Sequence, residues 1–254
     1  MTNEKAIQGE VVEQTALQKA VAAEKIKEIL YDADAPQRVR FQTERAARFY
    51  NVVHIFGPIL DDNVLEYERS KNQRIGEADA NQSDDEDATL IRSNTFNAAL
   101  IYWNKSGTKT EGYAGKVSDR DKAFAVGLLF GVEFESLRTA ESDQLCPEEG
   151  EDESTYIMRC LFDGDEVYTQ AVMRSATANQ IEQFESLMEQ TLLVRGTRYG
   201  QRDQRIPARA KRLAEMFDQM VVSTKGYEGR LPLHHKVAFA LRHLRAEQKA
   251  ITGN

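Results

Sequence analysis

Hydrophobic and polar positions along this chain switch between helix-like and strand-like spacing, which predicts a mixed α+β fold. Near the N-terminus, apolar residues at helical spacing follow Thr15, a residue suited to an N-cap, and predict a helix over about 16–31. Apolar residues at i, i+3, i+4 and i+7 predict a second helix over about 36–56. The four residues of that second stripe are Phe49, Val52, Val53 and Phe56.

The next part of the chain changes from polar to apolar. Residues 61–87 contain ten acidic and three basic residues. Because such a segment has too few apolar side chains to offset the entropy lost on ordering, it predicts a loop or linker over 61–92. The run TFNAALIYW, Thr95–Trp103, is typical of a strand because it is rich in aromatic and aliphatic residues. Ser118, followed three residues later by Asp121, resembles a capping box and predicts a helix directly after it.

A hairpin and three helices are predicted in the remainder. Two strand-like runs flank Asp163–Gly164, a residue pair that favours a type I′ turn. Thr177 and Gln180 form a capping box before a helix over about 178–194. Pro207 and Pro232 each suit the first turn of a further helix.

These elements group into four consecutive parts. We expect a helical N-terminal segment over 1–60 and an acidic loop or linker over 61–92. A small antiparallel β region with one hairpin and one helix should occupy 93–173. A C-terminal unit of three helices should occupy 174–254.

Charge is distributed unevenly along the chain. The net charge is −8, yet residues 194–254 contain 13 Lys and Arg against 5 Asp and Glu. The densest basic run lies in 194–212, where arginine dominates, and the planar guanidinium suits phosphate or carboxylate. The candidate basic interaction residues are Arg195, Arg198, Arg202, Arg205, Arg209, Lys211 and Arg212. The candidate acidic partner surface, on another copy or another protein, comprises Asp84, Asp85, Glu86, Asp87, Glu148, Glu149, Glu151, Asp152 and Glu153.

Three interpretations of the basic run stay open. It could contact nucleic acid, pair with an acidic protein surface, or form an ordinary solvated loop and helix start. The strongly acidic remainder of the chain disfavours nucleic acid, because its field repels a polyanion.

Residues with catalytic or metal-binding chemistry do not form a recognisable motif. Three of the four histidines lie in 230–250, but His235 and His243 are eight residues apart, about 12 Å along a helix, too far for one metal ion. Cys146 and Cys160 have no metal-ligand spacing, and the phosphate-loop and nucleophile-elbow patterns are absent. We therefore expect no enzymatic activity, no cofactor and no metal.

The segment from DEVYTQAVMRSATANQIEQFE through LVRGTRYG, residues 165–200, resembles structural or tail-assembly proteins of bacteriophages and related contractile particles. That resemblance implies a role in assembling a particle and assigns no role to individual residues.

Together these observations predict a non-enzymatic structural or assembly protein that acts through protein–protein interfaces, as a homo- or hetero-oligomer. The alternative is a nucleic-acid-binding accessory or regulatory protein that uses residues 195–212. No run reaches the roughly 20 apolar residues that span a bilayer, so we expect no membrane contact and a cytoplasmic location, or a particle assembled there.

Overall fold

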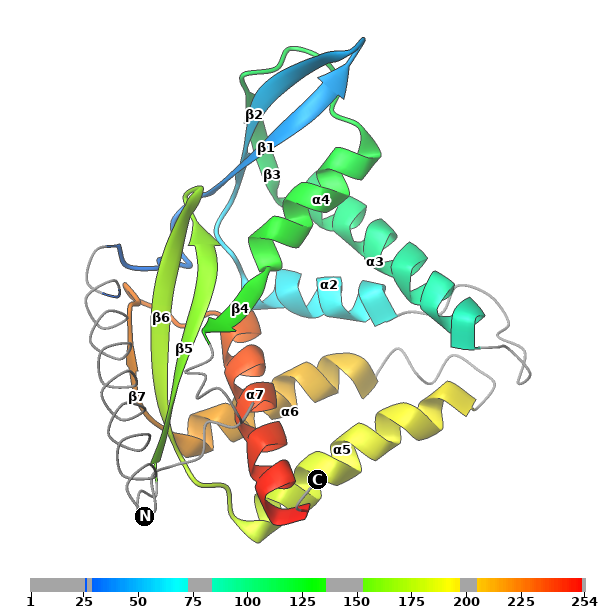
Figure 1. Cartoon of the computed structure of the whole chain (residues 1–254). Helices are drawn as coiled ribbons and strands as arrows, with labels where there is room; N and C mark the ends of the chain where they lie inside the picture. Colours follow the sequence, from blue (N-terminus) through cyan, green and yellow to red (C-terminus); the bar gives the residue numbers. More distant parts are fainter. Residues whose placement is uncertain (1–25, 27–28, 73–83, 136–152, 197–204, 253–254) are drawn as a thin grey trace, which may run out of the picture.

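The computed structural model describes residues 26, 29–72, 84–135, 153–196 and 205–252. In these residues helices are mixed with two antiparallel sheets, ordered β1-β2-β3 and β4-β5-β6-β7, which confirms the α+β class (Figure 1). The predicted helix over 16–31 lies almost entirely outside the described residues.

The predicted helix over 36–56 is wrong, because this segment forms a hairpin of β1 (Gln37–Arg45) and β2 (Arg48–Phe56). In β1 every second side chain from Gln37 to Thr43 is buried, a period of two that only a strand produces. The helical spacing of apolar residues in 49–56 was misleading, because a run rich in aromatic and β-branched residues also suits a strand. β3 (Gly107–Glu111) adds the third strand beside β2.

The predicted acidic loop is also wrong over much of its length. Residues of this segment form α2 (Asp61–Asn72) and the start of α3 (Asp84–Ser106). In α2, acidic residues occupy the first turn and basic residues the last, which complements the helix dipole. The buried side chains of Val64 and Tyr67, three residues apart, attach α2 to the core.

The predicted strand over Thr95–Trp103 is instead the C-terminal half of α3. Its buried residues come in adjacent pairs four apart, Ala98 with Ala99 and Tyr102 with Trp103, which is helical spacing. The composition of this run favoured a strand, but its packing against α2 and α4 stabilises a helix. α4 (Asp119–Phe130) begins as predicted, because the backbone N–H of Asp121 donates to Ser118 Oγ.

The predicted hairpin around Asp163–Gly164 is confirmed. β5 (Glu153–Phe162) and β6 (Asp165–Arg174) pair along their whole length, and both turn residues have positive φ. β4 (Val132–Glu135) and β7 (Val221–Lys225), neither of which was predicted, complete this sheet at its two edges.

Three C-terminal helices are present as predicted: α5 (Ala178–Gly196), α6 (Arg205–Met220) and α7 (Leu233–Thr252). The capping box before α5 is confirmed, since the Gln180 backbone donates to Thr177 Oγ1 and the Gln180 side chain accepts from the Thr177 backbone. The helices cover one face of the second sheet, where Phe184, Phe217 and Phe239 are buried with sheet residues.

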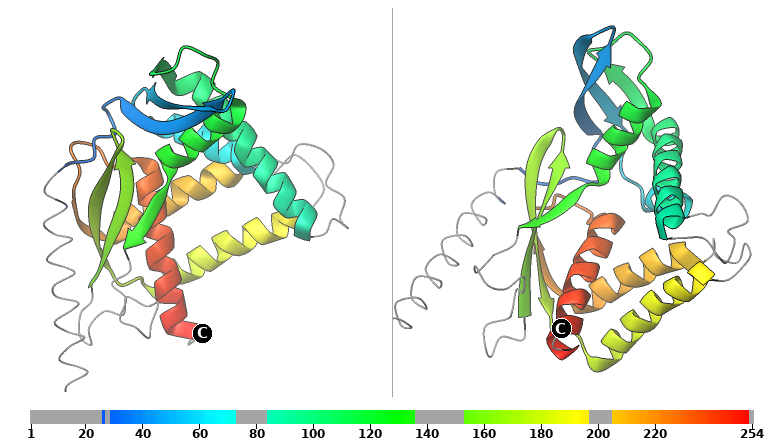
Figure 2. Two further views of the ribbon diagram at one scale, coloured as in Figure 1. Left: turned by 45° about the horizontal axis from the view of Figure 1, so that its top comes forward. Right: turned by 45° about the vertical axis from the view of Figure 1, so that its right-hand side comes forward.

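Two hydrophobic clusters make up the core of the described residues. One joins the first sheet to α2, α3 and α4, and the other lies between the second sheet and α5–α7. The first sheet stands at one end of the molecule and α5 at the opposite end, as Figures 1 and 2 both show.

Candidate interaction surface

The loop between β1 and β2 is the outermost part of the first sheet (Figure 2). We call Glu44, Arg45, Arg48 and Phe49, which surround the turn residues Ala46 and Ala47, the hairpin tip. Phe49 is 71% exposed, the highest fraction of any large hydrophobic side chain in the described part of the chain. It stands directly across the hairpin from Glu44, on the face opposite to the buried residues of β1.

The turn at the hairpin tip has an unfavourable backbone conformation. Ala46 and Ala47 have φ of 51° and 58°, the pattern of a type I′ turn, in which asparagine and glycine are the preferred residues. Left-handed backbone costs roughly 1–2 kcal/mol for a residue with a Cβ. Such strain, kept in a native structure, is concentrated at functional sites.

Arginine side chains at the tip add a second unfavourable feature. Arg45 and Arg48 are direct cross-strand partners, and like charges in this position destabilise a hairpin. Across residues 29–72, 84–135, 153–196 and 205–252, no carboxylate lies within ion-pair distance of either guanidinium. Both arginines are therefore available to an external acidic group.

The hairpin that carries the tip contacts two other elements. On the buried face, Thr43 Oγ1 donates to Asp121 Oδ2 of α4 at 2.6 Å. On the exposed face, Arg38 and Arg40 form ion pairs with Asp163 and Asp165 of the β5–β6 turn, at 3.0 and 3.5 Å. These contacts connect the hairpin to α4 and to the β5–β6 turn.

Relaxing the turn should stabilise the protein. Replacing Ala46 with Asn and Ala47 with Gly supplies the preferred type I′ residues, and we expect the free energy of unfolding to rise by about 1–2 kcal/mol. Urea denaturation of the double variant and the wild type measures the difference. A double variant that unfolds at lower urea would show that the turn is not strained.

The predicted basic residues are only partly described. Arg198 and Arg202 lie outside the described residues, and Arg195 and Arg205 belong to helices but their side chains are not described. Arg209 Nη2 contacts Met188 Sδ at 3.0 Å, so this residue helps to join α6 to α5. The remaining two, Lys211 and Arg212, are exposed on α6.

The predicted acidic surface is described even less. The first turn of α3 contains Asp84, Asp85, Glu86 and Asp87, whose side chains are not described. Glu148, Glu149, Glu151 and Asp152 lie outside the described residues. Glu153 is exposed at the start of β5. The pairing of the basic run with this surface therefore stays a prediction.

Three of the four histidines, His54, His235 and His243, are buried in the core. His235 lies within hydrogen-bond distance of the Tyr227 hydroxyl at 3.1 Å, and His243 lies between the Tyr156 hydroxyl and the Arg174 carbonyl. Burial lowers the pKa of His54 to about 4 and that of His235 well below its ordinary value. These rings are neutral at physiological pH.

Cys160 is buried as well, and burial raises the pKa of its thiol to about 12. A thiol held protonated in this way is a poor nucleophile. In the described part of the chain, no three His, Cys, Asp or Glu residues are grouped as a metal site would require.

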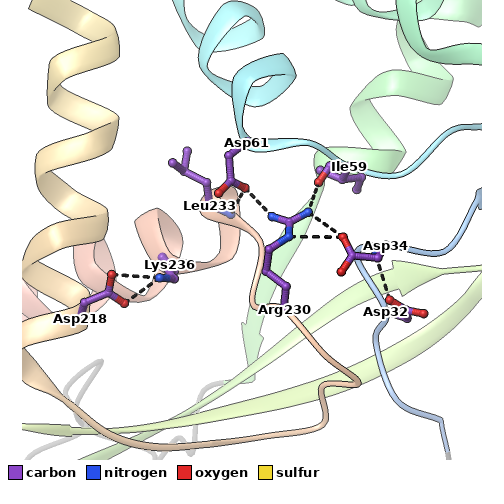
Figure 3. A network of polar contacts seen from close by, with 8 residues as sticks. All are labelled: Asp32, Asp34, Ile59, Asp61, Asp218, Arg230, Leu233 and Lys236. Carbon is purple, nitrogen blue, oxygen red and sulfur yellow. Dashed lines mark hydrogen bonds and ion pairs between the residues drawn. The ribbon is translucent and has the colours of Figure 1, made fainter.

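One arginine joins three separate parts of the molecule (Figure 3). Arg230, in the loop before α7, donates to Asp34, to Asp61 at the start of α2, and to the Ile59 carbonyl. The Leu233 backbone N–H also donates to Asp61 Oδ1, so this carboxylate caps α7 as well. The network therefore links the segment around Asp34 to α2 and to α7.

Comparison with known proteins identifies no relative: no protein-family model, no curated protein and no solved structure matches this chain. Among the described helices, none has the length and apolar character needed to cross a bilayer.

Proposed function

We propose that this chain is a non-enzymatic assembly protein that inserts the hairpin tip into a complementary site on another protein. The observation that carries the proposal is the tip itself. It combines a largely exposed phenylalanine, a strained turn and two facing arginines on a braced hairpin. Each feature lowers the stability of the isolated chain, and a bound partner would reverse at least two of them.

The chemistry of the tip defines the partner site. A pocket with an apolar floor would bury Phe49, and carboxylates at its rim would pair with Arg45 and Arg48. Arginine and aromatic residues dominate the binding energy of protein interfaces, where a few central side chains contribute most of the affinity. The resemblance of residues 165–200 to phage tail-assembly proteins favours a particle component as the assembled product.

A photo-cross-linking experiment tests this proposal. A benzophenone-bearing phenylalanine analogue is placed at position 49 in cells that produce the protein, and the adducts formed on illumination are identified by mass spectrometry. We expect one discrete protein adduct, because the exposed ring should lie inside the partner. The same analogue at Phe124, which is 56% exposed on α4, is the matched control and should give no discrete adduct.

Two other results would count against the proposal. Adducts with nucleic acid alone would replace it with the nucleic-acid-binding alternative, since exposed aromatic rings flanked by arginine also stack on bases. An equal, diffuse set of adducts from positions 49 and 124 would show that the tip binds nothing specific.

A further inference from the structure

A cleft of about 460 Å³ lies between α5 and α6, at the end of the molecule opposite to the hairpin tip (Figure 1). Leu187 and Met216, both largely buried, supply its apolar floor. Its rim is exposed and polar. The rim residues are Asn179, Glu182, Gln183, Ser186, Arg212, Glu215 and Gln219.

Contacts between the two helices bound the cleft on both sides. Gln180 Nε2 donates to Gln219 Oε1 at 3.4 Å on one side, and Arg209 Nη2 contacts Met188 Sδ at 3.0 Å on the other. These two contacts join α5 to α6 on either side of the opening. The cleft is thus a preformed feature of the described fold.

The charges of the cleft are the inverse of those of the hairpin tip. The rim has two glutamates, Glu182 and Glu215, and one arginine, Arg212. At the tip, Glu44 lies beside Phe49 on one face of the hairpin, and Arg45 and Arg48 lie on the other face, next to the turn. None of the three charged rim residues has an ion-pair partner among the residues that the structure describes.

The size of the cleft also suits the tip. A cavity of about 150 Å³ accommodates a benzene ring, so about 460 Å³ leaves room for a phenyl ring and the neighbouring side chains. The slim Ala46–Ala47 turn adds little bulk beyond Phe49. The rim amides of Gln183 and Gln219 can pair with Gln42 and Asn51, which flank the tip on its exposed face.

We propose that the α5–α6 cleft is the receptor for the hairpin tip of a second copy of this chain. Phe49 contacts the floor formed by Leu187 and Met216, the tip arginines pair with Glu182 and Glu215, and Glu44 pairs with Arg212. The inference rests on the function proposed above and names its partner. Because tip and cleft lie at opposite ends of one molecule, the contact is head-to-tail and builds rings or filaments.

Mixing two defective variants tests the inference. Phe49→Ala removes the tip residue, and Glu215→Arg reverses one rim charge, while each variant keeps the other half of the contact. We expect each alone to self-associate at least about tenfold more weakly than the wild type, a difference of about 1.4 kcal/mol. An equimolar mixture should form one-to-one dimers in sedimentation velocity, through the intact tip of one variant and the intact cleft of the other.

Controls separate folding from binding. Phe124→Ala and Glu228→Arg alter exposed residues away from both surfaces and should assemble as the wild type does. Circular dichroism tests whether each variant is folded. If Glu215→Arg is unfolded, Gln183→Arg, at another exposed rim position, takes its place. The charge exchange of Arg48→Glu with Glu215→Arg in one chain should restore assembly.

Three results would overturn the inference. The first is that the wild type stays monomeric at every concentration. The second is that Phe49→Ala assembles normally, and the third is that Glu215→Arg assembles normally. Cross-links from position 49 to a different protein would overturn the cleft as receptor and leave the proposed function standing. Diffuse cross-links together with a monomeric wild type would remove both.

Discussion

Replacing Arg230 with alanine should lower the free energy of unfolding by about 3 kcal/mol, because hydrogen bonds to a charged group contribute roughly 1.5–3 kcal/mol and this guanidinium makes several. Its side chain is only 33% exposed and bonds Asp34, Asp61 and the Ile59 carbonyl. The loss would leave the Ile59 carbonyl and one carboxylate oxygen without a donor. Arg230→Lys keeps the charge but not the planar fork, and should recover only part of the stability.

Arg159 provides the matched comparison for Arg230. It also pairs with two carboxylates, Glu133 and Glu166, and its side chain is 37% exposed, close to the 33% of Arg230. Among the described residues, however, Arg159 has neither the backbone carbonyl acceptor nor the helix-capping carboxylate that Arg230 binds. Exposed ion pairs contribute about 0–1 kcal/mol, so Arg159→Ala should change stability little. Urea denaturation of both variants measures the difference. Equal effects at the two positions would contradict the central role given to Arg230.

Stability should fall steeply as the pH drops below about 6.5, because buried histidines are neutral in the folded protein and titrate normally when it unfolds. Burial lowers the pKa of His54 to about 4 and that of His234 to about 3, with Arg230 adding to the shift of His234. From pH 6.5 down to these values the unfolded chain binds more protons. In this range each buried histidine lowers the free energy of unfolding by up to about 1.4 kcal/mol for every pH unit that the pH falls.

His234 should be the most informative residue in this pH range. Both of its ring nitrogens are buried without a hydrogen-bond partner in the described part of the chain, an arrangement that costs about 1–3 kcal/mol. His234→Leu should therefore raise stability at pH 7 and reduce its dependence on pH. The stability of the variant is measured by urea denaturation at pH 7 and pH 5.

His243→Leu is the control for His234→Leu. Both nitrogens of His243 have partners: Nε2 donates to the Arg174 carbonyl at 2.8 Å, and Nδ1 accepts from the Tyr156 hydroxyl at 2.9 Å. This variant should lose roughly 1–3 kcal/mol, because it removes the buried hydrogen bonds of His243 to the Tyr156 hydroxyl and the Arg174 carbonyl. If both leucine variants destabilise the protein equally, the unpaired state of His234 is contradicted.

Local signals predicted the second half of the fold well. The Asp163–Gly164 turn and the capping boxes at Ser118 and Thr177 depend on residues close in sequence, and all three are confirmed. Helices and strands in the first half were exchanged, because their apolar residues fit both periods. Tyr102 and Trp103, for example, suit a strand by composition, and contacts with distant elements make them helical.

The candidate interaction surface could not be recognised from the sequence. Ala46–Ala47 is not a turn-forming pair, so nothing local marked the hairpin or exposed Phe49. The alternation of apolar and polar residues over 37–44 was the available signal for a strand, but the helical spacing of apolar residues over 49–56 pointed to a helix instead. The α5–α6 cleft depends on the tertiary packing of two helices, although Arg212 was already among the predicted interaction residues.

We propose that copies of this chain assemble through the hairpin tip. The most direct measurement is the molar mass by light scattering across a concentration series, at low and high salt, for the wild type and Phe49→Ala. We predict masses that rise with concentration well above the 28.8 kDa of one chain, fall at high salt because screening weakens the charge pairs, and stay near 28.8 kDa in the variant. A wild-type mass of 28.8 kDa at every concentration and salt would contradict the claim.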